Sequence, residues 1–216
     1  MYIYAAVVLY CATGIVYGAA MRLALVSSKG GTGKTTSSVF LASALHRQGR
    51  TLAIDADPQG SLTSWSAGGE LPFTVVSMPT PQIHRQIADL AADYEHVVID
   101  TPPGDMAITR SAILAVPLVL VPVSPTGLDI DRLRPTWEAL ADLEPTHPLG
   151  LAVGVLLTKT RSGTRSRREA RDVLTELDYP VMETEIPLAE WPYAVSFGTC
   201  PREFGAYDDL LAELKR

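Results

Sequence analysis

A short glycine-rich segment with a lysine at each end is the part of this sequence best suited to do chemistry. It runs from residue 28 to residue 36 and reads SKGGTGKTT. Glycines let consecutive backbone N–H groups converge on phosphate oxygens, while Lys34 can reach the outer phosphates and the Thr35 hydroxyl can bind Mg²⁺. The segment therefore predicts a phosphate-binding loop made by Lys29, Gly30, Gly31, Thr32, Gly33, Lys34, Thr35 and Thr36.

Two aspartate-bearing segments are expected to meet this loop. Asp57 lies in IDADPQG (residues 54–60), and Asp100 ends the apolar run of VVIDTPPG (residues 97–104). In an open parallel sheet, ligands bind beyond the carboxyl ends of the strands, where the phosphate loop also lies. We therefore expect Thr35, Asp57 and Asp100 to form a magnesium site. Asp57 should also orient an attacking water, so Lys34 and Asp57 are expected catalytic residues.

The elements that must position these residues alternate between short apolar runs and helix-like segments from Met21 onward. Several apolar runs are continuous, which is typical of strands buried on both faces of a parallel sheet. The sequence therefore predicts one doubly wound α/β domain of the P-loop type over residues 21–216. Expected strands are 22–26, 51–56, 73–77, 96–100, 118–123, 151–157 and 181–186, and expected helices are 34–48, 81–92, 106–115, 130–143, 166–177 and 206–215.

Composition narrows the class of protein further. The 216 residues carry a net charge of −6, so contact with nucleic acid would require a local basic patch. The two cysteines form no CxxC pair, so no disulfide framework or metal spacing is indicated, and a reducing cytoplasm is expected. Residues 1–20 form an apolar extension with a membrane-spanning length. Because the first strand follows at once, we expect Met21 to be the true start, with a membrane segment as the alternative.

From Met21 onward the chain resembles the ParA/MinD family of deviant-Walker ATPases. The matching stretches are KGGTGKTT (29–36), IDADPQG (54–60), VVIDTPPG (97–104) and VPVSPTGLD (121–129). The resemblance implies binding of ATP and Mg²⁺ and a homodimer in the ATP state. In this dimer Lys29 contacts the nucleotide phosphates of the other subunit, which makes it a third expected catalytic residue. The resemblance also implies that Gly104 and Asp105 sense the γ-phosphate and that the base lies near Thr158, Lys159, Pro187 and Leu188.

A cluster of arginines stands out in an otherwise acidic protein. The segment TRSGTRSRREARD contributes five, and Ser166 to Glu169 has a capping-box pattern that predicts the start of a helix there. These arginines could bind DNA phosphates without sequence preference, or they could form a solvated face paired with nearby acids. The candidate DNA-binding residues are Arg161, Arg165, Arg167, Arg168 and Arg171.

The resemblance favours a slow, partner-stimulated ATPase that drives plasmid or chromosome partition. Such a protein would bind non-specific DNA, associate with the nucleoid and respond to a ParB-type or other centromere-binding protein. The alternative is a MinD-like or other ParA-like ATPase that positions a cargo or acts at a membrane without acting on DNA. The acidic ending AYDDLLAELKR argues against membrane binding, because such proteins usually end in a basic amphipathic helix.

Overall fold

A computed structural model describes residues 20–189, 192–193 and 196–216. Within them, seven parallel strands form one sheet in the order β3-β2-β4-β1-β5-β6-β7. The strand order reverses around β1, which lies between β4 and β5, and this is where a doubly wound sheet leaves a crevice for a ligand. The strands are β1 (Arg22–Leu25), β2 (Thr51–Asp55), β3 (Thr74–Ser77), β4 (His96–Asp100), β5 (Leu118–Val123), β6 (Ala152–Thr160) and β7 (Ile186–Pro187).

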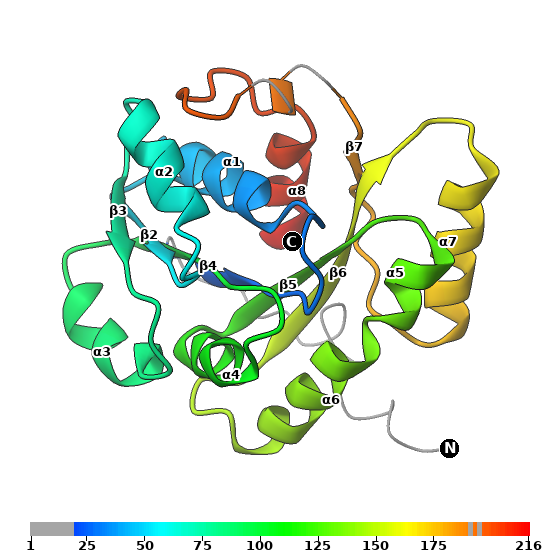
Figure 1. Ribbon diagram of the computed structural model, residues 1–216, viewed down its shortest axis with the longest axis horizontal. Helices are drawn as coiled ribbons and strands as arrows, with labels where there is room; N and C mark the ends of the chain where they lie inside the picture. Colours follow the sequence, from blue (N-terminus) through cyan, green and yellow to red (C-terminus); the bar gives the residue numbers. More distant parts are fainter. Residues whose placement is uncertain (1–19, 190–191, 194–195) are drawn as a thin grey trace.

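Helices cover both faces of the sheet (Figure 1). One apolar core joins the sheet to α1, α2 and α8, and a second core joins the opposite face to α3, α4, α6 and α7. Alternate strand residues supply the two cores, with Leu23 in the first and Ala24 in the second. The helices are α1 (Lys34–His46), α2 (Ser61–Gly68), α3 (Ile83–Leu90), α4 (Met106–Ala115), α5 (Gly127–Asp131), α6 (Arg134–Leu143), α7 (Arg165–Glu176) and α8 (Ala206–Leu214), with the short 3₁₀ helix η1 (Glu144–Thr146) after α6.

The predicted doubly wound α/β fold is confirmed, with differences in individual elements. The expected helix 130–143 is two helices, α5 and α6, and Pro135 lies in the first turn of α6. A single continuous helix would place this proline in its interior, where the missing N–H and the ring break the hydrogen-bond ladder. The expected strand 181–186 is also wrong: the structure has an isolated bridge at Val181 and the two-residue strand β7.

The capping-box prediction at Ser166 is wrong as well. Helix α7 begins one residue earlier, after Thr164, and no side chain caps its N-terminus. The Thr164 hydroxyl donates instead to the carbonyl of Arg161, within the preceding turn. Arg165 is consequently the first residue of the helix rather than a loop residue, which brings four of the five clustered arginines onto α7.

The N-terminal extension lies almost entirely outside the described residues. The expectation of an over-extended start or a membrane segment concerns residues 1–20, of which the structure describes only Ala20. Among the residues described, no helix has both the length and the apolar character needed to span a bilayer.

Candidate nucleotide site

The glycine-rich segment forms a loop between β1 and the N-terminus of α1. Gly31 and Gly33 have φ values of 76° and 94°, a left-handed conformation that residues with a Cβ adopt only at a cost. Helix α1 begins at Lys34, so its free N–H groups and the positive end of its dipole lie at the loop. This is the strand, loop and helix arrangement that the sequence predicted for phosphate binding.

Lys34 is folded over the loop that precedes it. Its ammonium donates to the carbonyl oxygens of Lys29 at 3.0 Å and Ser27 at 3.3 Å. Burial lowers the pKa of Lys34, while the charges of Asp100 and Asp57 oppose the shift. Both carboxylates are therefore near enough to this ammonium to favour its charged form.

Asp100 ends β4 and contacts the first turns of α1. Its carboxylate accepts hydrogen bonds from the Thr35 hydroxyl at 2.7 Å and the Ser38 hydroxyl at 3.2 Å. Burial raises the pKa of Asp100 to about 7, against the lowering effect of these hydroxyls and of Lys34. A dication beside this carboxylate would stabilise its charged form. Thr35 and Asp100 are thus paired as a magnesium site requires, and Ser38 is a contact that the motif did not reveal.

The two aspartates of the 54–60 segment have different environments. Asp55 is fully buried and accepts from the backbone N–H and the hydroxyl of Thr63, at 2.8 and 2.7 Å, which ties the end of β2 to α2. Asp57 is half-buried and accepts from the backbone N–H of Gln59 at 2.9 Å. Asp57 is therefore partly open to solvent and near enough to Lys34 for their charges to interact, and its role with water and Mg²⁺ stays a prediction.

Lys29 forms an ion pair within its own chain. Its ammonium contacts the carboxylate of Asp129 in α5, and the Asp129 side chain is only 4% exposed. The Lys29 side chain is 31% exposed, so part of it faces solvent beside the phosphate loop. Asp129 was not predicted as a site residue, although it closes the VPVSPTGLD segment that carried the family resemblance.

The remaining expected nucleotide contacts come from β6, from β7 and from the loop before α4, and those on β6 touch the phosphate loop. The Thr158 hydroxyl donates to the Thr32 carbonyl at 2.8 Å, and the Lys159 ammonium donates to the Gly31 carbonyl at 2.5 Å. Gly104 is exposed with φ 76°, in the loop before α4, and Asp105 caps that helix through the N–H groups of residues 107 and 108. Pro187 lies in β7, paired with the end of β6.

The arginine cluster divides into two groups. Arg167 and Arg171 donate to the buried carboxylate of Glu185, with the closest contacts at 2.6 and 2.7 Å. Arg161, Arg165 and Arg168 are exposed, and Arg165 pairs with Glu169 one turn along α7. The expected five-arginine DNA surface is therefore reduced, because Arg167 and Arg171 are bound within the protein.

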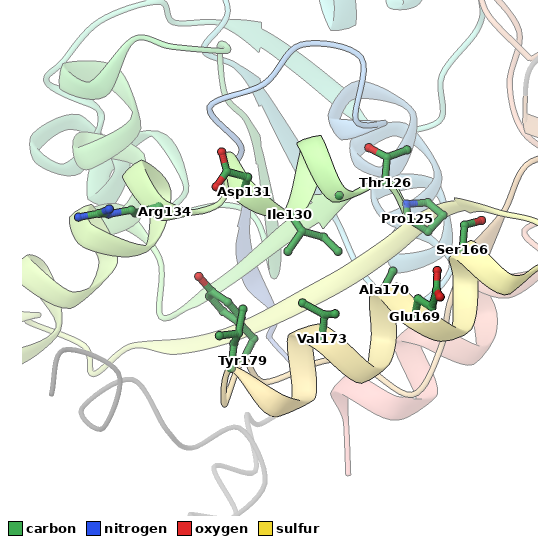
Figure 2. A pocket seen from close by; sticks show the side chains of 12 residues that line it. Pro125, Thr126, Ile130, Asp131, Arg134, Ser166, Glu169, Ala170, Val173 and Tyr179 are labelled. Atoms are coloured by element: carbon green, nitrogen blue, oxygen red, sulfur yellow. The ribbon is translucent and has the colours of Figure 1, made fainter. Parts of the chain in front are cut away.

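A groove of about 800 Å³ runs between α5–α6 and α7 (Figure 2). Ile130, Val173 and Tyr179 line it with apolar surface, and Asp131, Arg134 and Glu169 add charged groups. Helix α5 consequently has two environments: Asp129 contacts Lys29 at the phosphate loop, while Ile130 and Asp131 line the groove.

The donor set at the crevice suits a magnesium-bound nucleoside triphosphate. It combines left-handed glycines at a helix N-terminus, a buried lysine and a hydroxyl paired with a carboxylate. Fold and site together define the protein as a P-loop nucleotide-binding protein. The sequence model described as the CobQ/CobB/MinD/ParA nucleotide binding domain matches residues 23–195. The chain belongs to this family, which confirms the family-level resemblance.

Two individual relatives show what the chain is similar to at the level of sequence. It is 31% identical over 174 residues to the "Maintenance of carboxysome distribution protein A" of Halothiobacillus neapolitanus, covering 77% of this chain and 79% of the relative. It is 28% identical over 170 residues to "Protein ParA" of Rhizobium radiobacter, with 77% of each chain covered.

Solved structures support the fold. The cobyrinic acid a,c-diamide synthase of Mycobacterium smegmatis with bound ADP and magnesium is similar at a TM-score of 0.71 and 22% identity, covering 91% of this chain and 96% of that one. Its bound ligands agree with the expected cofactors, ATP and Mg²⁺.

Proposed function

We propose that this protein is an ATP-dependent switch that positions a cargo inside the cell. The observation that carries the proposal is the likeness to a carboxysome distribution protein over about three quarters of both chains. The proposal is also supported by the phosphate loop at the start of α1 and by the pairing of Thr35 with Asp100. The proposal favours the alternative from the sequence, cargo positioning, over partition of DNA.

The residues of the site support hydrolysis of ATP. The loop N–H groups and Lys34 would hold the phosphates, while Thr35, Asp57 and Asp100 would hold Mg²⁺, which would offset negative charge on the phosphates. Asp57 would orient the water that attacks the γ-phosphorus as the bond to the β-phosphate oxygen breaks. Lys29 would leave Asp129 and reach the phosphates of a second subunit, so that ATP joins the two subunits.

Sedimentation velocity with Mg-ATP and with Mg-ADP tests this cycle. The wild type should form a dimer only with ATP and should hydrolyse ATP slowly. Lys29→Gln should bind ATP as a monomer, because the lysine that joins the subunits is absent. Asp57→Ala should remain dimeric because hydrolysis is blocked. A wild type that stays monomeric with Mg-ATP, or a Lys29→Gln variant that dimerises normally, would contradict the proposal.

A second candidate function is partition of DNA with a ParB-type partner. It is favoured by the three exposed arginines at the start of α7 and in the turn before it, Arg161, Arg165 and Arg168. The ion pair of Arg165 with Glu169 is exposed and therefore weak, so it does not withhold this arginine from a phosphate. A dimer would present two copies of this cluster.

Membrane positioning through α8 is not favoured. Tyr207, Leu210 and Leu214 of α8 are buried against the core shared with α1. An amphipathic helix binds a membrane through its apolar face, and α8 uses that face to hold the domain together.

A further inference from the structure

We propose that Lys159 and Thr158 are positioning residues that orient the phosphate loop through hydrogen bonds to its carbonyl oxygens. This inference rests on the proposed nucleotide function and differs from the role expected from the sequence, in which both residues lie near the base. The two residues lie near the end of β6, one and two positions before its last residue, and bind neighbouring carbonyl oxygens of the loop: Thr158 binds that of Thr32, and Lys159 binds that of Gly31.

Consecutive strand residues normally point to opposite faces of a sheet, so two neighbours cannot usually reach the same loop. At this point β6 is irregular. Its pairing with β7 shifts register between Thr158 and Thr160, and Lys159 has a left-handed φ of 55°. Such irregularities re-aim side chains. Here the irregularity turns the lysine toward the loop that the preceding threonine already contacts.

Holding these two carbonyls determines where the loop's N–H groups point. In a trans peptide the C=O and the following N–H point in opposite directions. The carbonyl of Gly31 therefore orients the N–H of Thr32, and the carbonyl of Thr32 orients the N–H of Gly33. With both carbonyls bound to β6, both N–H groups face away from it. The glycines on either side of Thr32 have φ values of 76° and 94° and would otherwise be free to rotate.

Lys159 contributes a charge as well as a hydrogen bond. Its side chain is exposed and its ammonium donates to the Gly31 carbonyl; within the described residues Lys159 forms no ion pair, so no carboxylate there neutralises its charge. A positive charge behind the peptide dipoles strengthens their attraction for phosphate oxygens. We call this pair of residues, Thr158 and Lys159, the brace. The brace should affect the binding of any phosphate ligand, whereas a base contact affects only ligands that carry the base.

Binding measurements with three ligands separate the two roles. Mg-ATP, Mg-GTP and inorganic tripolyphosphate with Mg²⁺ are titrated into the full chain and its variants. Lys159→Met keeps the length of the side chain and removes the charge. It should weaken all three ligands by a similar factor, about tenfold for the loss of one charge-assisted hydrogen bond. Lys159→Arg should restore most of the affinity for tripolyphosphate.

Two further variants remove the main ambiguities. Lys159→Gly relieves the left-handed backbone but also lacks the ammonium, so it should bind as weakly as Lys159→Met. Thr158→Val removes one hydroxyl at nearly constant volume and should weaken the same three ligands. Arg202→Met makes the same change in charge at an exposed position outside β6 and the phosphate loop, and this control should bind tripolyphosphate normally.

Unchanged tripolyphosphate binding in Lys159→Met, together with weaker ATP binding, would show a base contact and overturn the brace. Normal binding of all three ligands by both Lys159→Met and Thr158→Val would also overturn it. The outcome is independent of the cargo-positioning cycle, because a wild type that binds Mg-ATP without dimerising would contradict the proposed function and leave the brace standing.

Discussion

At the scale of single residues, the nucleotide site contains a buried carboxyl group, that of Asp100, whose charged form is poorly solvated. Asp100 is buried at the end of β4, and its pKa is raised from 3.8 to about 7. Thr35 and Ser38 donate to it, yet burial remains the dominant influence on its pKa. The charged form of Asp100 therefore lowers the stability of the nucleotide-free protein, and binding of Mg²⁺ would offset this loss.

Asp100→Asn should stabilise the nucleotide-free protein above neutral pH. Between pH of about 4 and 7, the native state holds a proton on Asp100 that the unfolded chain has lost. The free energy of unfolding of the wild type should therefore fall, relative to the variant, by up to about 4 kcal/mol as pH rises through this interval. Urea unfolding of both proteins at pH 4.5, 6 and 8 measures the difference.

The same substitution should remove magnesium-dependent hydrolysis, because a neutral amide is a poorer ligand for Mg²⁺ than a carboxylate. Added Mg-ATP should accordingly stabilise the wild type more than the variant at pH 8. If the free energies of unfolding of the two proteins changed with pH in parallel, the raised pKa that we assign to Asp100 would be contradicted.

At the scale of elements, the buried side chain of Glu185 joins α7 to the segment that precedes β7. Glu185 has a side chain only 7% exposed and accepts from both Arg167 and Arg171. Burial alone would raise the pKa of Glu185, but the hydrogen bonds and charges of the two arginines outweigh it and lower the pKa below its ordinary value. Arg171 extends the connection by donating to the carbonyl of Met182 at 3.0 Å.

Glu185→Gln should destabilise the fold by about 1–3 kcal/mol, because it removes the partner of two partly buried cations. The loss should be present near neutral pH. It should shrink as pH falls below about 4.5, where the wild-type carboxylate itself becomes protonated through its lowered pKa. Glu169→Gln breaks an exposed pair on the same helix and should cost less than about 0.5 kcal/mol. Equal losses in the two variants, measured by urea unfolding, would contradict the role given to Glu185.

The sequence predicted most accurately those elements whose run of apolar residues matches their burial in the fold. The strands at 96–100 and 118–123 agree with the predicted bounds because they are continuously apolar and buried on both faces. Helix α2 was missed, since it is short and depends on a tertiary contact, the hydrogen bonds from Thr63 to Asp55. The first helix is shorter than its expected range of 34–48, because α1 ends at His46 and Arg47 follows it in a right-handed conformation.

The candidate site was predictable in its chemistry but not in its internal contacts. Lys34, Thr35 and Asp100 follow from a motif whose residues lie close along the chain or at strand ends. The pairing of Lys29 with Asp129 joins residues 100 positions apart and depends on how α5 packs. The division of the arginines likewise depends on Glu185, which no local pattern links to α7.

At the scale of the whole molecule, charge decides which surfaces can meet DNA. The chain carries a net charge of −6, so most of its surface repels a polyanion. Arg161 and Arg168 are exposed, at the start of α7 and in the turn before it. One pair of arginines would bind DNA only weakly on a protein with this net charge. A dimer would present two such pairs, which could bind the same DNA together. DNA affinity, if present, should therefore depend on ATP.

The final prediction concerns Arg161→Ala combined with Arg168→Ala. If the second candidate function holds, the wild type should bind random duplex DNA with Mg-ATP and not with Mg-ADP. Its affinity should fall steeply with salt, because each phosphate contact releases counterions. The double variant should bind at least about tenfold more weakly, and its salt slope should be smaller by about 2–4 per dimer.

Arg85→Ala combined with Arg202→Ala makes the same change in net charge at exposed positions outside α7 and serves as the control. An equal loss in both double variants would mean that total charge, rather than the α7 cluster, governs the binding. If the ATP-bound wild-type dimer binds no DNA at all, the arginines have no such role. The molecule would then have to position its cargo along a track other than DNA, and the groove beside α5 would become the surface to test for a protein partner.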